Sequence, residues 1–188
     1  MASAPDGQGD CAYELDADLC FRSVDARWTE FARTNAAPEL CAPSLIGRRL
    51  FDCVADPSTA ILYRRAFERA RESGRPVVLP FRCDSPALRR FMEIEISATG
   101  DGGFRVCTRV VRVESREPVA LLDATWARGD ELLRMCGWCK RVDASGRWLE
   151  VEAAVEALRL FDEHTLPRIS HGICPECETR LLGALAPW

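Results

Sequence analysis

Lysine and histidine are scarce in this sequence of 188 residues, and long apolar runs are missing. Lys140 is the only lysine, so the other 24 of the 25 basic residues are arginines, and the only histidines are His164 and His171. No segment approaches the roughly 18 consecutive apolar residues that a bilayer-spanning helix needs. The net charge of −4 gives no bulk attraction to phosphate backbones or to anionic lipids. We therefore expect neither a nucleic acid nor a membrane as partner.

Targeting and catalytic motifs are also missing. The start, "MASAPDGQGD", has neither the basic region nor the apolar region of a secretory signal, so we expect residues 1–10 to be a flexible tail and the protein to be cytoplasmic. The sequence has no phosphate-binding glycine loop, no kinase motif set and no hydrolase elbow. We therefore expect no enzyme.

Cysteine, in contrast, is abundant, with ten residues. A cytoplasmic chain of this size does not need disulfides to hold its core. Six cysteines stand singly among apolar residues, and we expect these to be small buried hydrophobic side chains. They are Cys11, Cys20, Cys41, Cys53, Cys83 and Cys107.

The other four cysteines form two pairs with the spacing of metal ligands. Two residues separate Cys136 from Cys139 and Cys174 from Cys177, and 34 residues lie between the pairs. Two residues between ligands let a tight turn, or knuckle, aim both sulfurs at one ion. Four thiolates leave no open position for water, so the spacing predicts a closed, structural Zn²⁺ site. His171 is the one candidate to replace a cysteine as ligand.

Two other interpretations of these thiols stay open. The stretch "CGWC" has the spacing of a thioredoxin-like redox pair, but such a site needs a helix directly after it, whereas a hairpin is expected here. Disulfides are disfavoured because a secretory signal is missing.

The residues around the pairs predict local structure. "KRVDASGRWLEV" is typical of a hairpin with its turn at residues 143–146, and "VEAAVEALRLF" has apolar residues at helical spacing. Pro175 follows Cys174 and suits the first turn of a final helix in "ECETRLLGAL". The second thiol pair would then lie at a helix N-terminus, which favours thiolates. Lys140 and Arg141 would offset the negative charge of the cluster.

A knuckle, a hairpin and a ligand-bearing terminal helix together resemble a treble-clef zinc finger. The segment 136–177 is also similar to a cysteine-rich tail of bacterial PAS-containing and response-regulator-type signalling proteins, in which a "CxWCKxI"-like knuckle, a Trp and "SHGICPEC" recur in that order. The resemblance implies a zinc-binding module over residues 134–188. Residues 131–188 contain seven Arg plus Lys and nine Asp plus Glu, so we expect this module to contact protein and not nucleic acid.

The N-terminal two-thirds predicts two short strands, short helices, a longer helix from Asp56 to Gly74, and three further strands. This order resembles a PAS domain, and "WTEFARTN" and "IGRRLFD" are similar to PAS signatures. The resemblance implies an α+β fold in which a five-stranded antiparallel sheet with flanking helices spans residues 11–115. It also implies a sensory and dimerising module with a small cavity.

The last two strands of this sheet allow a prediction of register. If residues 98–102 form the loop, the inner faces pair apolar side chains and the outer face pairs opposite charges. The pairs expected are Ile96 with Phe104, Ile94 with Val106, and Glu95 with Arg105.

Apolar side chains of this domain are candidates for the cavity wall, although ordinary core packing explains them as well. They are Trp28, Phe31, Phe67, Phe81, Met92 and Ile94. The sequence has no flavin-binding "NCRFLQ"-like helix and no histidine in this domain to bind haem, so the ligand is unknown and the domain can equally have none. Haem bound through Cys41, Cys53 or Cys83 stays open.

Cys83 is also a candidate reactive thiol. It precedes the turn-forming Asp84-Ser85-Pro86, and Arg82, Arg89 and Arg90 nearby would lower its pKa. The alternative is a hairpin with solvated arginines.

Residues 116–133 begin with a proline-containing stretch followed by a helix-compatible stretch, and we expect a partly helical linker that transmits a signal or contributes to a homodimer. Together these features predict a non-catalytic signalling protein. Its PAS-like domain would sense a small molecule or redox state, and its zinc module would contact a partner protein. The alternatives are a thiol-based redox switch that releases zinc on oxidation and a nucleic-acid-binding zinc-finger regulator.

Overall fold

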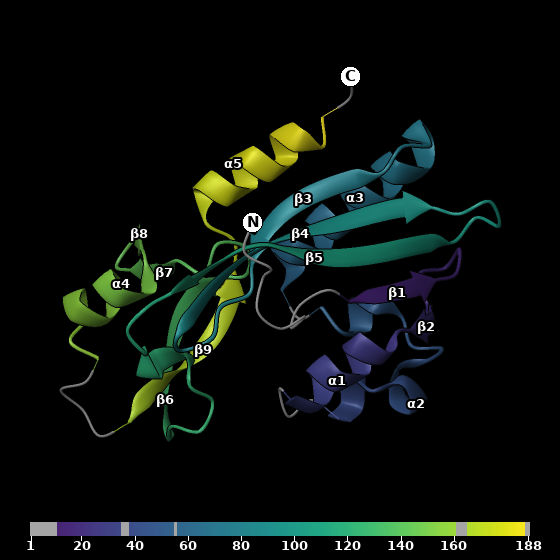
Figure 1. Cartoon of the computed structure of the whole chain (residues 1–188). Coiled ribbons are helices and arrows are strands. Elements are labelled where there is room, and N and C mark those ends of the chain that lie inside the picture. Colours follow the sequence, from purple (N-terminus) through teal and green to yellow (C-terminus); the bar gives the residue numbers. More distant parts are fainter. Residues whose placement is uncertain (1–10, 35–37, 55, 161–164, 187–188) are drawn as a thin grey trace, which may run out of the picture.

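A computed structural model describes residues 11–34, 38–54, 56–160 and 165–186 of the chain (Figure 1). The predicted tail, residues 1–10, lies outside the described residues. The first part of the chain forms the predicted five-stranded antiparallel sheet, and its strands lie in the order β2-β1-β5-β4-β3. Its strands are β1 (Ala12–Leu15), β2 (Phe21–Val24), β3 (Val77–Arg82), β4 (Leu88–Ala98) and β5 (Phe104–Ser115).

The helices between β2 and β3 follow the local signals of the sequence. They are α1 (Ala26–Thr34), the one-turn α2 (Ala42–Leu45), two 3₁₀ turns (Pro38–Leu40 and Leu50–Asp52) and the long α3 (Pro57–Ser73). The side chain of Asp56 accepts a hydrogen bond from the backbone N–H of Thr59 at 2.7 Å and thereby caps α3. Gly74 ends this helix in the left-handed region at φ 62°. One face of α3 is buried.

The predicted register of β4 and β5 is wrong by two residues. Ile96 lies opposite Val106, Ala98 lies opposite Phe104, and Glu95 faces Cys107 instead of Arg105. The strands extend further because a tight loop joins them, in which the N–H of Thr99 donates to the oxygen of Gly103 at 2.9 Å. A shift of two residues leaves every side chain on its predicted face, which is why the apolar pattern alone did not reveal it.

The last third of the chain forms a second sheet in the order β8-β7-β6-β9. Its strands are β6 (Arg128–Cys136), β7 (Val142–Ala144), β8 (Arg147–Leu149) and β9 (Leu166–Gly172), accompanied by the helices α4 (Val151–Ala157) and α5 (Pro175–Ala184). The hairpin β7–β8 and both helices were predicted. In Figure 1 this sheet and α4 lie to the left of the first sheet.

The predicted linker, residues 116–133, differs from expectation. Its only helical turn is the 3₁₀ turn Ala120–Leu122, and from Arg128 onward the chain is strand β6. Leu133 and Met135 are buried while Leu132 and Arg134 are exposed, the alternation of a strand with one covered face. Strand β9, which pairs with β6 in parallel, was not predicted either.

Two apolar clusters hold the fold together. The smaller one contains residues of α4, β6 and β7 together with Val119 and Leu121. The larger one begins in the five-stranded sheet and α3 and continues without a break into Cys136, Trp138, Cys174 and the α5 residue Leu181. The cysteine-containing segment therefore shares a core with the first sheet. Among the described residues, no helix combines the length and the apolar character that crossing a bilayer requires.

Candidate metal centre

The two cysteine pairs meet because β6 and β9 run in parallel and end at the same edge of their sheet. Cys136 is the last residue of β6 and lies opposite Gly172, the last residue of β9. The N–H of Gly137 then donates to the oxygen of Gly172 at 2.8 Å. This pairing brings the second pair, which begins two residues after β9, beside the first.

The first pair lies on a tight knuckle. The N–H of Lys140 donates to the oxygen of Cys136 at 3.0 Å, and the N–H of Cys136 donates to the oxygen of Arg141 at 2.8 Å. Lys140 adopts the left-handed region, with φ 62°, so the chain reverses within five residues. Cys136 is buried and Cys139 is half-buried.

The second pair lies on the first turn of α5, as predicted. Cys174 is the N-cap residue, Pro175 follows it, and the sulfur of Cys174 accepts a hydrogen bond from the N–H of Cys177 at 3.4 Å. The N–H of Cys174 in turn donates to the sulfur of Cys136 at 3.4 Å. Both cysteines of this pair are buried. Backbone N–H groups directed at sulfur stabilise the thiolate form that a metal ion requires.

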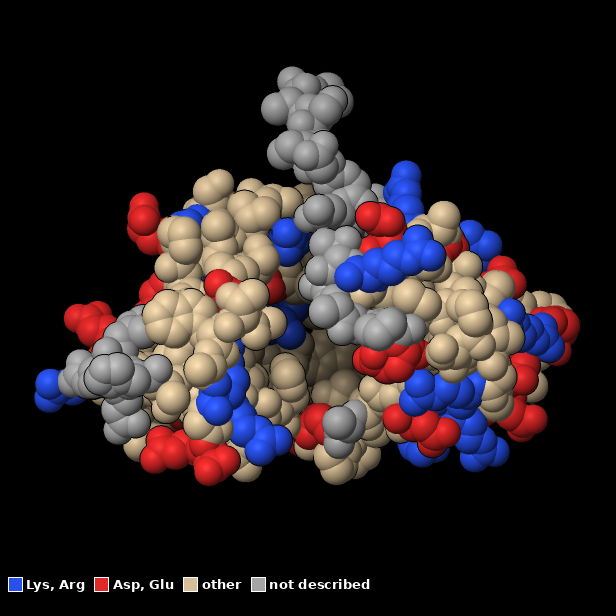
Figure 2. Space-filling view, turned by 90° about the horizontal axis from the view of Figure 1, so that it is seen from below, with Lys and Arg blue, Asp and Glu red and all other residues tan. Residues whose placement is uncertain are grey.

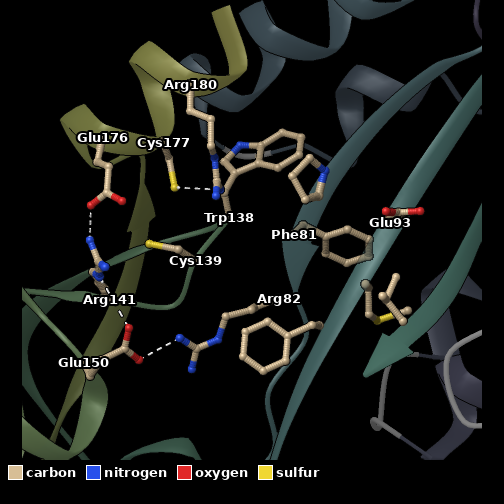
Figure 3. Close-up of a pocket in the computed structure, with 14 residues that line it drawn as sticks. Phe81, Arg82, Glu93, Trp138, Cys139, Arg141, Glu150, Glu176, Cys177 and Arg180 are labelled. Atoms are coloured by element: carbon tan, nitrogen blue, oxygen red, sulfur yellow. Dashed lines mark hydrogen bonds and ion pairs between the residues drawn. The ribbon is translucent and has the colours of Figure 1, made fainter. Parts of the chain in front are cut away.

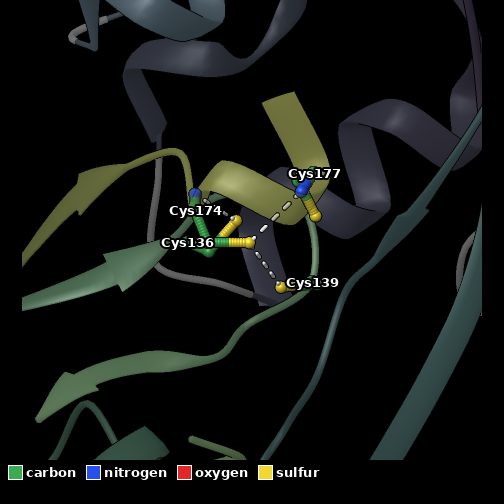
Figure 4. Close-up of side chains that lie close together, drawn as sticks. All are labelled: Cys136, Cys139, Cys174 and Cys177. Atoms are coloured by element: carbon green, nitrogen blue, oxygen red, sulfur yellow. Dashed lines mark hydrogen bonds between the residues drawn. The ribbon is translucent and has the colours of Figure 1, made fainter. Parts of the chain in front are cut away.

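All four sulfurs lie within 4.8 Å of one another (Figure 4). The sulfurs of Cys139 and Cys174 are 3.7 Å apart. A tetrahedral ion with metal–sulfur bonds of about 2.3 Å requires an edge of about 3.8 Å between sulfurs. The four side chains thus converge at a spacing that fits one metal ion. His171, the predicted substitute ligand, lies exposed on β9 and is not part of this group.

Among the described residues, Arg180 contacts one of the ligand sulfurs, and this contact was not predicted. Its guanidinium donates to the sulfur of Cys177 at 3.7 Å. The predicted cations make other contacts: the Lys140 ammonium donates to the oxygen of Gly137 at 3.0 Å, and Arg141 pairs with carboxylates. The signal for Arg180 was its place one helical turn after Cys177.

The thiols also influence one another. Hydrogen bonds from the thiols of Cys139 and Cys177 lower the pKa of Cys136. No disulfide joins any of the ten cysteines.

The knuckle is fixed to the first sheet through Trp138. The backbone oxygen of Trp138 accepts a hydrogen bond from the N–H of Arg82, at the end of β3, at 2.7 Å. The indole ring is buried and packs against Tyr63 of α3 with ring centroids 5.9 Å apart. A pocket of about 260 Å³ opens beside this contact. Figure 3 shows Cys177 and Arg180 of α5 on one side of it and Phe81 of β3 on the other.

A partly buried ion-pair network, which was not predicted, also joins the two parts of the chain. The Asp84 carboxylate is fully buried and pairs with the guanidinium groups of Arg82 and Arg116, whose side chains are 9% and 5% exposed. Arg82 also binds Glu150 at 2.6 Å, and Arg116 binds Glu152 of α4 at 3.3 Å. Both glutamates belong to the cysteine-containing part of the chain, so the network crosses the junction.

Five of the six predicted wall residues line a second cavity, of about 290 Å³, beside the first sheet. They are Trp28, Phe31, Phe81, Met92 and Ile94. The sixth, Phe67, packs instead against Phe104 in the core, with ring centroids 4.7 Å apart.

The single cysteines differ from expectation, since only Cys11 is buried and the other five are half-buried. Cys11, Cys53 and Cys83 line the second cavity. The arginines near Cys83 have other contacts: Arg82 and Arg89 bind carboxylates, and Arg90 donates to the backbone oxygen of Cys83 at 3.4 Å. The reactivity of Cys83 stays a prediction.

No protein-family model and no curated protein sequence matches the chain. The residues themselves therefore define the candidate: a mixed α and β protein with a four-cysteine site able to hold a metal ion.

Proposed function

We propose that this chain is a non-catalytic sensory protein of PAS type. In this proposal the cavity beside the five-stranded sheet receives the signal, and a zinc module at the C-terminal end transmits it to a partner protein. Three features support the PAS assignment: the order of strands and helices, the antiparallel sheet, and the apolar cavity against it. The knuckle, the hairpin β7–β8 and the helix α5 with its two cysteines support a treble-clef-like module.

Zinc is the metal that suits the donor set best. Four thiolates at tetrahedral spacing are typical of structural Zn²⁺ sites in proteins without disulfides. Cys136, Cys139, Cys174 and Cys177 would hold the ion and leave no position for water. The ion would then supply folding free energy, on the order of 10 kcal/mol, and no hydrolytic chemistry.

One observation supports the sensory role most directly: the cavity beside the first sheet and the pocket beside the knuckle share a wall. Phe81 and Met92 line both the cavity and the pocket beside the knuckle. Tyr63, which lines the cavity, packs against Trp138, which lies between two of the ligands. A molecule in the cavity would therefore press on side chains that touch the knuckle, so that binding at one site changes the packing at the other.

Filling the cavity by mutation tests this coupling without a known ligand. Cys53→Phe puts a ring into the cavity, and Cys41→Phe makes the same change outside its wall. With Co²⁺ bound in place of Zn²⁺, we expect C53F, and not C41F, to alter the visible Co²⁺ absorption and the hydrogen exchange of residues 137–140. Spectra and exchange equal to wild type in a folded, metal-loaded C53F protein would contradict the proposal.

A thiol-based redox switch is the second candidate, because the sulfurs are not fully shielded. Cys139 and Cys177 both line the pocket beside the knuckle. Two thiolates can form a disulfide by giving two electrons to hydrogen peroxide, which takes up two protons and leaves as two waters. Zinc release after mild peroxide, followed with a chromogenic chelator and reversed by dithiothreitol, would favour the switch. Retention of zinc would leave a purely structural site.

A nucleic-acid-binding role finds less support. Acidic and basic side chains are interspersed on the face shown in Figure 2, whereas phosphate binding needs a clustered basic surface. Salt-dependent retention on DNA would overturn this expectation.

A further inference from the structure

The cavity beside the first sheet has a wall without formal charge. Fifteen described residues line it, and none of them is an Asp, Glu, Lys, Arg or His. A carboxylate or phosphate in such a place would lose its hydration and gain no cation in return, a cost of several kcal/mol. The described wall thus disfavours a charged group that lies against it.

The size of the cavity limits the ligand further. Its volume of about 290 Å³ is roughly twice that of an engineered apolar cavity of about 150 Å³ that binds benzene. Two fused six-membered rings are therefore the scale of molecule that fits.

The chemistry of the wall favours an aromatic molecule over an aliphatic one. Three thiols and the thioether of Met92 give it polarisable sulfur, which contacts aromatic rings favourably. Six aromatic side chains supply ring faces and edges. They are Tyr13, Phe21, Trp28, Phe31, Tyr63 and Phe81.

Two tyrosine hydroxyls add polar groups to the cavity wall, besides the Thr108 hydroxyl, which is hydrogen-bonded to the backbone of Cys11. Tyr13 and Tyr63 both line the cavity, and Tyr63 lies close enough to raise the pKa of Tyr13. Among the described residues neither hydroxyl has a hydrogen-bond partner, in contrast to the Trp28 indole N–H, which donates to the oxygen of Leu40 at 2.8 Å. Burial raises the pKa of Tyr63 to about 12, and burial together with Tyr63 raises that of Tyr13. Both hydroxyls therefore stay protonated and can donate a hydrogen bond at neutral pH.

We propose that this cavity binds a neutral aromatic molecule of about two fused rings that carries one hydrogen-bond acceptor, such as a carbonyl oxygen, directed at the hydroxyls of Tyr13 and Tyr63. This inference rests on the proposed sensory function, because it names the class of molecule that the sensor takes. The sulfur and aromatic side chains hold the rings, and the two hydroxyls orient the acceptor.

Three probes of the same ring size separate the effect of the hydrogen-bond acceptor from the effect of charge. Their affinities are measured by isothermal titration calorimetry on the full-length, metal-loaded protein at pH 7. The probes are 2-acetylnaphthalene, which is neutral with an acceptor, naphthalene, which lacks the acceptor, and 2-naphthoate, which is charged. We expect 2-acetylnaphthalene to bind best and naphthalene to bind about tenfold more weakly, because it leaves the hydroxyls without a partner. We expect 2-naphthoate to bind more than about 100-fold more weakly.

Variants locate the binding. Tyr63→Phe removes one donor and should weaken 2-acetylnaphthalene by roughly fivefold to tenfold while leaving naphthalene unchanged. Cys53→Phe should abolish binding of both, whereas Cys41→Phe, outside the wall, should bind as wild type does.

Each other result overturns the inference. Equal or tighter binding of 2-naphthoate would refute the neutral ligand class. Equal loss of both neutral probes in Tyr63→Phe would refute the orienting role of the hydroxyls. If no probe binds, the ligand class is wrong, while the sensory proposal is still decided separately by the Co²⁺ spectrum of the Cys53→Phe protein, which needs no ligand.

Discussion

The buried carboxylate of Asp84 allows a quantitative test of how the two sheets are held together. Asp84→Ala removes the anion that lies between Arg82 and Arg116, both almost fully buried. Removing one partner of a buried ion pair costs about 3–5 kcal/mol, because the remaining charge stays buried without compensation. Here each arginine keeps a second carboxylate, Glu150 at 2.6 Å or Glu152 at 3.3 Å, which places the expected loss near the lower limit, at about 3 kcal/mol.

For a chain of this length, about 3 kcal/mol corresponds to a fall in Tm of roughly 6–12 °C. The assay is urea unfolding followed by circular dichroism with saturating Zn²⁺, together with a thermal scan. Glu14→Ala is the matched control, since Glu14 pairs with Arg105 at the surface, with side chains 47% and 58% exposed, and should change stability by less than about 1 kcal/mol. A loss below about 1 kcal/mol for Asp84→Ala, or equal losses for both variants, would refute the assigned role of the network.

Three further predictions test other contacts. Trp138→Ala should lower the free energy of unfolding by about 3–5 kcal/mol, because the ring is buried against Tyr63. Trp126 is exposed, so Trp126→Ala should lower it by less than about 1 kcal/mol, and equal losses in urea titrations would contradict this. The pKa of Tyr63 is about 12 in the folded chain and about 10 in the unfolded chain, so the unfolded chain loses this proton at lower pH. The free energy of unfolding should therefore fall as the pH rises from 10 to 12. Tyr63→Phe should show a shallower fall, and an equal slope in both proteins would exclude the effect. Gly103→Ala would bring a Cβ to 2.4 Å from a backbone oxygen of β1 and should cost about 1–3 kcal/mol, whereas Gly100→Ala meets no atom within 4 Å and should be near neutral in the same titration.

Much of the local structure was predictable from short signals. The cap Asp56 and the terminator Gly74 set the limits of α3, because each acts on its own helix end. The spacing of the cysteines identified the four candidate ligands for the same reason: each pair is closed by a few neighbouring residues. Five of the six residues proposed for the cavity wall lie together, because the apolar pattern indicated the inner side of helix α1 for Trp28 and Phe31 and of the strands for Phe81, Met92 and Ile94.

What could not be predicted depends on partners far apart in sequence. Nothing in "LPRISHG" identifies β9 until β6 lies beside it, and this parallel pairing is what joins the two cysteine pairs. The predicted register of β4 and β5 was wrong by two residues, because a shift of two leaves each side chain on the same face of the sheet. Asp84 begins the stretch Asp84-Ser85-Pro86, which is typical of an exposed turn. Its carboxylate is buried only because Arg116 and the segment containing Glu150 pack against this turn.

The metal content of the purified chain tests the central claim most directly. Native mass spectrometry of a fresh, reduced preparation should give one Zn²⁺ per chain for the wild type and none for Cys136→Ser, while Cys20→Ser, a half-buried cysteine outside the four-sulfur group, should keep its ion. Removal of the ion with a chelator should unfold the segment from residue 134 onward, seen as loss of hydrogen-exchange protection in α5. A chain that is folded to the same extent without any metal ion would contradict the account.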